Sequence, residues 1–212
     1  MEEATLSQAL PLITLDRLDI FEHLDREVAV LVDDQGKPWG NHIVVCLSPK
    51  SLAQQIQIHQ RPAKTFPLAR VIDFLLKEKR EILQLYGFAL GDYALEREEL
   101  CKIAGPIETF CLLLTCIKEQ LSPEETFERM KQATVYYLGS PILSPQTASF
   151  DFEVQEIDGK AYITLFLSEQ SARRYAFHQK QVVPVQLASF RSFVQEKYGL
   201  VLEPRRPYCL RF

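Results

Sequence analysis

Two Ser-x-x-Ser pairs are the residues of this sequence whose type and spacing most directly suggest binding chemistry. Ser48 and Ser51 form the first pair, Ser168 and Ser171 form the second, and each pair follows a run of apolar residues. A serine at a helix start accepts a hydrogen bond from a first-turn N–H group, and N–H groups exposed there can bind an anion or a carboxylate. The four serines are candidate ligand-binding residues, although plain helix capping explains them more simply.

A small group of basic residues follows the second serine pair. Arg173, Arg174 and His178 lie on the helix that the pattern predicts after Ser168. They form a candidate surface for an acidic ligand or partner. A solvated helix face accounts for the same residues without any binding role.

The four histidines do not form a recognisable metal site. His23, His42, His59 and His178 are scattered, and neither a Cys-x-x-Cys nor a His-Glu-x-x-His pattern occurs. His42 and Cys46 lie four residues apart on a predicted strand and share a face, but two ligands are half of a tetrahedral site. We therefore expect no metal ion and no cofactor.

Motifs for catalysis are also missing from the sequence. There is no Gly-x-Ser-x-Gly elbow for a nucleophilic serine. No glycine-rich phosphate loop is found among the 8 glycines. We name no catalytic residue and expect the protein not to be an enzyme.

Composition and charge exclude several function classes. The 212 residues are 47% hydrophobic and 25% charged, with a formal charge of -4, so nothing attracts the chain as a whole to nucleic acid or anionic lipid. The N-terminus begins with Met-Glu-Glu instead of a basic segment, and no apolar run could span a bilayer. An odd number of irregularly spaced cysteines predicts reduced thiols and a cytoplasmic location: Cys46, Cys101, Cys111, Cys116 and Cys209.

The chain contains segments that read alike, which predicts an internal duplication. A Phe-Glu pair near a helix end, apolar strands, a strand before Ser-x-x-Ser, a Leu-Ala helix start and a Tyr-Gly strand recur in the same order. The matched segments are 20–24 with 126–130, 28–32 with 134–138, 43–47 with 163–167, 68–74 with 187–193, and 86–90 with 198–202.

The repeated unit predicts an α+β fold made of two similar mixed subdomains. Each reads as helix, β-hairpin strands, helix, apolar link, helix and short strand. We expect a first subdomain at 1–94, a helical connector at 95–121, and a second subdomain at 122–212 that ends in a strand. The first copy carries extra residues between 77 and 85, which we expect to lengthen its helix through Ile82 and Leu85.

The C-terminal segment has the alternation of a strand. Tyr208, Leu210 and Phe212 alternate with Cys209 and Arg211, so three large apolar side chains share one side. The segment has no counterpart in the first copy of the predicted repeat. We expect it to dock on an edge of its own sheet, with addition to a partner's sheet as the alternative.

The second copy carries a set of apolar and turn residues at characteristic spacing: Phe166, Ser168, Ala172, Val183, Pro184, Phe190, Phe193, Gly199, Glu203 and Pro204. With these residues it resembles the N-terminal domain of the enhanced-serine-sensitivity protein B (SseB) family of bacteria. The resemblance covers about residues 127–204 and departs from the family at Glu203, where Asn is usual. It implies a bacterial α+β module without established catalytic residues and with a poorly defined role.

These observations lead to a first expectation about function. We expect a non-catalytic bacterial protein-interaction or regulatory module whose partner is another protein, with neither nucleic acid nor membrane involved. The alternative is a module that senses a small ligand, an amino acid or organic acid, at the serine-capped helix starts. An unrecognised hydrolase is the third choice, and the sequence leaves the oligomeric state open.

Overall fold

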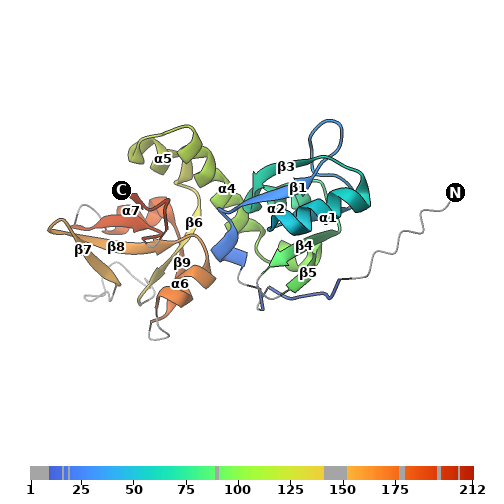
Figure 1. The fold of residues 1–212 in the computed structure, drawn as a ribbon. Coiled ribbons are helices and arrows are strands. Elements are labelled where there is room, and N and C mark those ends of the chain that lie inside the picture. The colour runs from blue at the N-terminus through green and yellow to red at the C-terminus, as the bar shows by residue number, and fades with distance from the viewer. Residues whose placement is uncertain are drawn as a thin grey trace. The chain divides into compact units, whose positions relative to one another are not determined.

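The computed structural model divides the chain into two compact units, Met1–Ile107 and Glu108–Phe212 (Figure 1). The boundary falls within helix α4 (Ala104–Lys118), inside the segment predicted as a connector. The structure describes residues 10–15, 17–18, 20–88, 91–140, 152–176, 180–194, 197–204 and 206–212.

The first unit is a five-stranded sheet with helices. Its strands have the order β3-β1-β2-β4-β5, in which β2 and β4 are parallel and the other neighbours are antiparallel. The elements are η1 (Ile20–His23), β1 (Glu27–Leu31), β2 (His42–Cys46), α1 (Pro49–His59), β3 (Ala63–Pro67), α2 (Leu68–Lys77), β4 (Ile82–Phe88), β5 (Gly91–Glu96) and α3 (Arg97–Cys101).

Both faces of the central strands in this sheet are buried. The four apolar residues of β2 that follow His42 are all buried, as a strand covered on two sides requires. On one face Leu31, Val44 and Cys46 pack with Leu52 of α1. Helix α2 packs against β3 and β4 and buries one apolar stripe.

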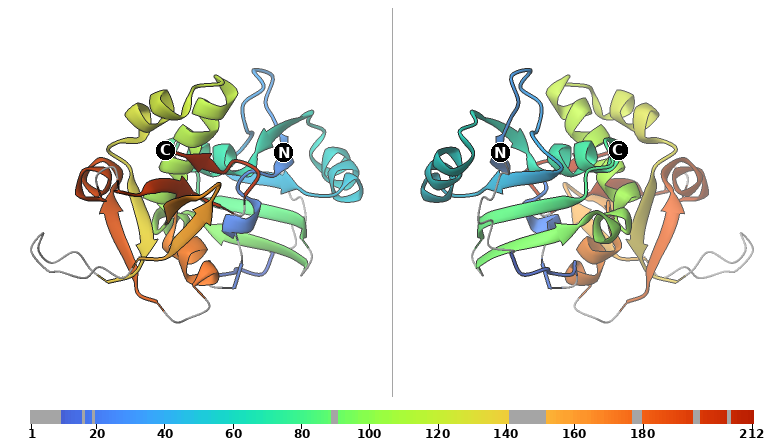
Figure 2. Two further views of the ribbon diagram at one scale, coloured as in Figure 1. Left: turned by 90° about the vertical axis from the view of Figure 1, so that its left-hand side faces the viewer. Right: turned by 90° about the vertical axis from the view of Figure 1, so that its right-hand side faces the viewer.

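The second unit is a sheet of similar construction (Figure 2). Its strands have the order β11-β10-β8-β6-β9, and β7 pairs with β8 in a hairpin. The elements after α4 are α5 (Pro123–Met130), β6 (Thr134–Leu138), β7 (Val154–Ile157), β8 (Lys160–Phe166), α6 (Glu169–Tyr175), β9 (Val182–Gln186), α7 (Leu187–Val194), β10 (Gly199–Leu202) and β11 (Leu210–Arg211).

The two sheets have the same strand order and the same strand directions. Strands β1, β2, β3, β4 and β5 correspond in place and direction to β6, β8, β9, β10 and β11. The predicted α+β class is confirmed. The segments 43–47 and 163–167 occupy equivalent positions, since each holds the central strand that runs into a serine-capped helix.

The pairing register corrects the predicted alignment of the last segments. Strand β2 pairs Ile43 with Leu83, and β8 pairs Ile163 with Leu200. Leu83 therefore corresponds to Leu200, and the match of 86–90 with 198–202 is wrong. The same comparison makes Val30 equivalent to Tyr137, one residue away from the predicted match of 28–32 with 134–138.

The predicted extension of the helix in the first copy is also wrong. Helix α2 ends at Lys77, and Ile82 and Leu85 belong to strand β4. Lys79 adopts a left-handed backbone conformation with φ 54°, which ends the helix before the chain turns into the strand. The spacing of Ile82 and Leu85 is compatible with a helix face, but Leu83 and Leu85 are the residues that alternate inward on the strand.

Two further predictions about the strands are settled by the pairing. The apolar links of the predicted unit are strands β3 and β9. The C-terminal strand does have a counterpart in the first copy, because β5 pairs with β4 as β11 pairs with β10, so the prediction of no counterpart is wrong.

Docking of the C-terminal segment on its own sheet is confirmed. The Leu200 N–H donates to the Phe212 carbonyl at 3.1 Å, and the Phe212 N–H donates to the Leu200 carbonyl at 2.8 Å. The Phe212 ring also packs edge-on against Phe127, with ring centroids 5.6 Å apart.

All five cysteines are free. Among the described residues, no helix has the length and apolar character to cross a membrane.

Candidate functional site

The first serine pair caps helix α1 and uses its hydroxyls for that purpose. The Ser51 N–H donates to Ser48 Oγ at 3.1 Å, and the Ser48 hydroxyl donates to Ser51 Oγ at 2.9 Å. The Ser51 hydroxyl in turn donates to the Ser48 carbonyl at 2.9 Å. The Ser48 N–H donates back to Ser51 Oγ at 3.4 Å, which completes a capping box and engages both hydroxyls within the helix start.

The second serine pair caps helix α6 in a similar way. The Ser171 N–H donates to Ser168 Oγ at 3.0 Å, and the two hydroxyls are 3.0 Å apart. Ser168 is buried, whereas Ser48 is only partly buried. The two serine pairs are equivalent in that both cap the start of a helix with the same geometry.

A group of ionisable side chains surrounds the first serine pair. The Gly87 N–H donates to Asp92 Oδ1 at 2.7 Å. Gly87 has φ +78°, and a side chain there would lie 2.9 Å from Ser48 Oγ. Burial is the main cause that raises the pKa of Cys46, to about 11, and burial also raises the pKa of Tyr86. The Cys46 thiol is therefore protonated at neutral pH and is a poor nucleophile.

Of the predicted basic residues, Arg173 and Arg174 are described, and they have different neighbours. Arg173 donates from Nε to Glu169 Oε1 at 2.8 Å, one turn back on α6. Arg174 lies near Arg206 instead; burial first, and then the charge of Arg206, lower its pKa. His178 lies outside the described residues.

Glu203 has a structural role at the end of β10. Its carboxyl group is buried, and Oε1 accepts the Leu167 N–H at 2.9 Å. Glu203 also has φ 50°, a conformation that Asn adopts more readily. The residue that departs from the resembled family thus still binds a backbone group beside the second serine pair.

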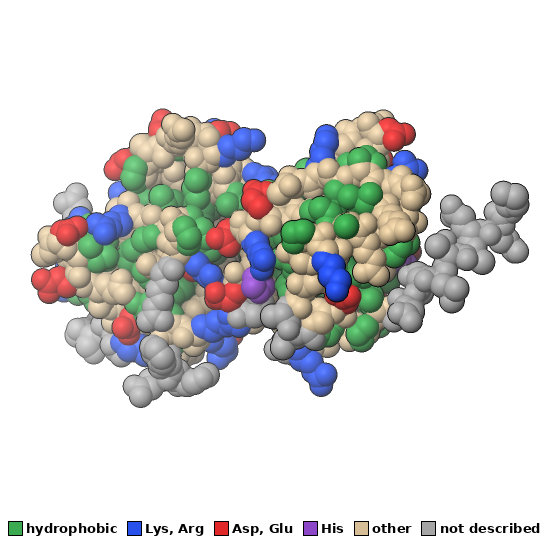
Figure 3. All heavy atoms as spheres, viewed as in Figure 1, with side chains coloured by type: hydrophobic (Ala, Val, Ile, Leu, Met, Phe, Trp, Pro, Cys, Tyr) green, Lys and Arg blue, Asp and Glu red, His purple; other side chains and the backbone are tan. Residues whose placement is uncertain are grey.

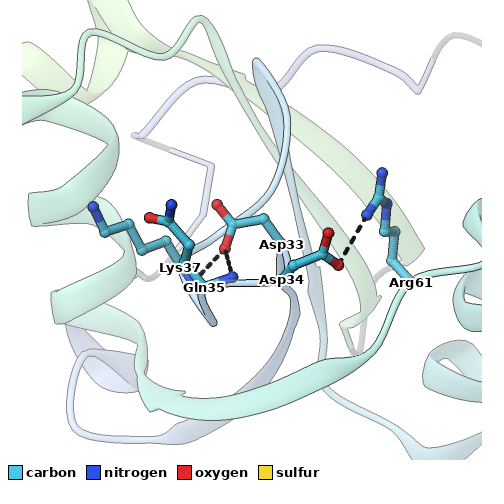
Figure 4. Close-up of polar contacts among 5 residues, drawn as sticks. All are labelled: Asp33, Asp34, Gln35, Lys37 and Arg61. Atoms are coloured by element: carbon cyan, nitrogen blue, oxygen red, sulfur yellow. Dashed lines mark hydrogen bonds and ion pairs between the residues drawn. The ribbon is translucent and has the colours of Figure 1, made fainter.

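An aromatic and charged cluster lies at one end of the first unit, where the sequence indicated no site. The Arg61 guanidinium lies 5.3 Å from the centre of the Trp39 ring, and the His59 ring lies 5.5 Å from it. Arg61 Nη1 is also 3.5 Å from Asp34 Oδ1 (Figure 4). Burial lowers the pKa of His59, which favours its neutral ring.

The loop that presents Asp34 and Trp39 is held by its own side chain. Asp33 Oδ1 accepts the N–H groups of Gln35 and Lys37, each at 2.9 Å, as Figure 4 shows. Such a local carboxylate bond stabilises a tight turn between strands. The cluster therefore sits on an ordered hairpin turn and on the end of α1.

Helix α1 presents apolar side chains to solvent next to this cluster. Ile56 and Ile58 are 37% and 46% exposed, whereas the polar Gln55, which precedes Ile56 in the chain, is buried. Figure 3 shows hydrophobic side chains reaching the surface of the first unit, on the face that carries α1 in Figure 1. Residues two apart on a helix do not face each other, so Ile56 and Ile58 flank the buried side of α1 from either side. We call the set around the end of this helix, Trp39, Ile56, Ile58, His59 and Arg61, the α1 surface.

The α1 surface contains residue types that dominate protein interfaces. Tryptophan and arginine are enriched among the residues that carry most binding energy. One sequence signal was available: Trp39 is the single tryptophan, and two isoleucines interrupt a glutamine-rich helix. The described residues contain no group of three or more potential metal ligands.

Comparison with known proteins identifies no family for this chain. No family model matches the sequence, and no curated protein matches it. The solved structures include one similar chain, Anabaena Tic22 (protein transport), with 13% identity, covering 92% of this chain and 94% of that chain at a TM-score of 0.23. A score this low carries no argument about fold or function. The resemblance to the enhanced-serine-sensitivity protein B family stays a prediction.

Proposed function

We propose that the protein is a non-catalytic interaction module that binds another protein through the α1 surface. The observation that supports this is the exposure of Ile56 and Ile58 on a helix that buries Gln55 instead. Burying a fully exposed isoleucine is worth on the order of 2 kcal/mol, so covering the exposed part of each of these half-buried side chains recovers about 1 kcal/mol. A partner that covers both of them must contact two sides of the helix end.

The chemistry of the α1 surface indicates what the partner presents. Ile56 and Ile58, on opposite flanks of the helix, each match an apolar side chain of the partner. Arg61, which is ion-paired with Asp34 and stacked on Trp39, adds a cation and an aromatic ring at the border. We expect an apolar residue flanked by a carboxylate on the partner, since the carboxylate can share Arg61 with Asp34.

The test compares two double substitutions on the same helix. Ile56→Glu with Ile58→Glu places two charges on the α1 surface. Gln54→Glu with Gln57→Glu is the matched control, because both glutamines are exposed and the change in charge is the same. Each variant and the wild-type chain would be used to capture proteins from lysate, with quantification by mass spectrometry.

The expected result is a protein retained by the wild type and the glutamine control but lost from the isoleucine variant. Thermal unfolding of all three chains shows whether the substitutions leave the fold intact. If the wild type and the isoleucine variant retain the same proteins in the same amounts, binding through the α1 surface is wrong.

A further inference from the structure

Strand β3 has an unpaired outer edge. Among the described strands it pairs only with β1, and its Lys64 and Thr65 are exposed. The other edge of this sheet is β5, where Ala94 N–H donates to the Pro11 carbonyl at 3.0 Å and Ile13 N–H donates to the Ala94 carbonyl at 2.9 Å. One edge of the first sheet is therefore covered by the N-terminal segment, and the other is open.

The hydrogen bonds at both ends of β3 show which backbone groups face outward. Val32 N–H donates to the Pro62 carbonyl, and Leu68 N–H donates to the Arg26 carbonyl. Backbone groups alternate between the two sides of an antiparallel strand, so residues 64 and 66 bond to β1. The residues whose N–H and C=O groups point away from the sheet are Ala63, Thr65 and Pro67, and Pro67 has only the carbonyl.

The equivalent edge of the second sheet is blocked at its centre. Leu187 N–H donates to the Ala133 carbonyl and Gly139 N–H donates to the Gln181 carbonyl, so the outward residues of β9 include Pro184. Thr65 pairs with Ala29 in the first sheet, and Pro184 pairs with Tyr136 in the same place in the second. Pro184 removes the outward donor without removing a bond to β6.

We propose that β3 pairs with β3 of a second copy of the chain, antiparallel and about a two-fold axis at Thr65, so that the two first sheets form one continuous sheet. In this register each Thr65 N–H donates to the partner's Thr65 carbonyl. Each Ala63 N–H donates to the partner's Pro67 carbonyl. Every outward N–H group of both strands thereby has an acceptor, and the proline lies where only an acceptor is needed.

Charge selects this register over the nearest alternative. If Ala63 instead faced the partner's Thr65, the donors would also be satisfied, but each Lys64 would lie opposite the partner's Lys64. Like charges in directly opposed, non-hydrogen-bonded pairs are destabilising. In the Thr65-centred register each Lys64 faces the partner's Phe66, which allows a cation–π contact.

The self-complementary register is the reason to assign a second copy as the occupant. When two copies of β3 run antiparallel, the donors of each strand face acceptors of the other, and Lys64 of each faces Phe66 of the other. Five residues per strand cover less area than the roughly 1,200 Å² of a stable interface. We therefore expect a dissociation constant in the micromolar range, on the order of 10 μM.

Sedimentation of the full chain from about 1 to about 200 μM, a range that brackets this dissociation constant, tests the proposal. The wild type should shift from monomer to dimer, and Thr65→Pro, which copies Pro184, should sediment as a monomer throughout. Gln186→Pro is the matched control, because it places proline at the outward position of β9 that corresponds to Pro67. It should dimerise like the wild type.

Cysteine cross-linking tests the register without changing backbone donors. In a chain whose exposed Cys101 is replaced by serine, Thr65→Cys should form a disulfide-linked dimer under mild oxidation. Opposed Cα atoms about 5.5 Å apart allow a disulfide. Lys64→Cys should not, since Lys64 faces Phe66.

Three outcomes would overturn the proposal. A wild type that stays monomeric up to the highest concentration excludes the dimer. A Thr65→Pro variant that is folded by circular dichroism and dimerises as strongly as the wild type excludes β3 as the interface. Cross-linking through Lys64→Cys but not Thr65→Cys excludes the Thr65-centred register.

Discussion

Thr65 and Pro184 occupy the same place in two sheets of the same topology, and they give the two edges opposite properties. The first unit exposes a backbone donor at the centre of its edge strand, whereas the second has none there. Proline at an exposed edge is a recognised way to prevent unwanted pairing. The comparison teaches that the shared strand order does not determine which unit can associate.

The interiors of the two units differ as well. Val30 and Val71 in the first unit correspond to Tyr137 and Phe190 in the second, where the two rings stack with centroids 4.8 Å apart. Both pairs are buried. The shared strand order depends on which positions are apolar, and the two units place side chains of different size at those buried positions.

The largest expected effect tests this difference in the cores. Phe190→Ala should reduce the free energy of unfolding of the second unit by about 3–5 kcal/mol, because it leaves a cavity beside Tyr137. The equivalent Val71→Ala removes a smaller side chain and should cost less. Hydrogen exchange followed by mass spectrometry measures the loss in each unit separately. Equal losses would contradict the distinction between the two cores.

The two units also differ in one titratable core residue, which gives the next largest expected effect. Cys46 in the first unit corresponds to Phe166 in the second. Burial raises the pKa of the Cys46 thiol from its ordinary 9.0 to about 11, so the stability that the buried thiol contributes is complete below pH 9 and is lost as the pH rises through about 11. This rise in pKa corresponds to about 3 kcal/mol of unfolding free energy.

Denaturant unfolding of the wild type and Cys46→Val between pH 8 and about 11 measures this effect. The wild type should lose more stability with pH than the variant. The excess loss should be confined to the first unit, because Phe166 does not titrate. Parallel pH profiles for the two chains would show that the thiol makes no contribution.

Removing the buried hydroxyl of Thr164 should have a smaller effect, and it should raise the free energy of unfolding instead of lowering it. Among the described residues, no partner accepts from or donates to the buried Oγ1 of Thr164. Its counterpart in the first unit is Val44. Thr164→Val should therefore raise the unfolding free energy by about 1 kcal/mol, because it removes an unsatisfied polar group and keeps the shape. Val44→Thr should lower it, and a thermal melt of each variant decides the sign.

The smallest expected effects come from the two helix caps. Ser48→Ala and Ser168→Ala should each cost about 1 kcal/mol in chemical denaturation. The loss should be greater at Ser168, which is buried, than at Ser48, which is partly exposed. Ser48→Asp retains an N-cap acceptor and serves as the conservative control. An aspartate variant as unstable as the alanine variant would show that the cap bond is not the cause.

Local patterns placed the two serine pairs, but the tertiary neighbours of the candidate residues were not predictable. Both serine pairs do begin helices, because N-capping involves only residues three apart in the chain. The approach of Arg174 to Arg206, and the contacts of Trp39 with His59 and Arg61, depend on segments that meet only in the folded chain.

The sequence by itself determined the α+β class, the helix starts and the similarity of the two halves, because these follow from apolar spacing and local capping. It did not determine the end of α2 or the partner of Leu83, since the same apolar residues fit a helix face and a strand. Only the tertiary structure decided that Thr65 and Pro184 are equivalent and face outward. That property depends on pairing register between strands far apart in the chain, where a shift of one residue reverses every side chain.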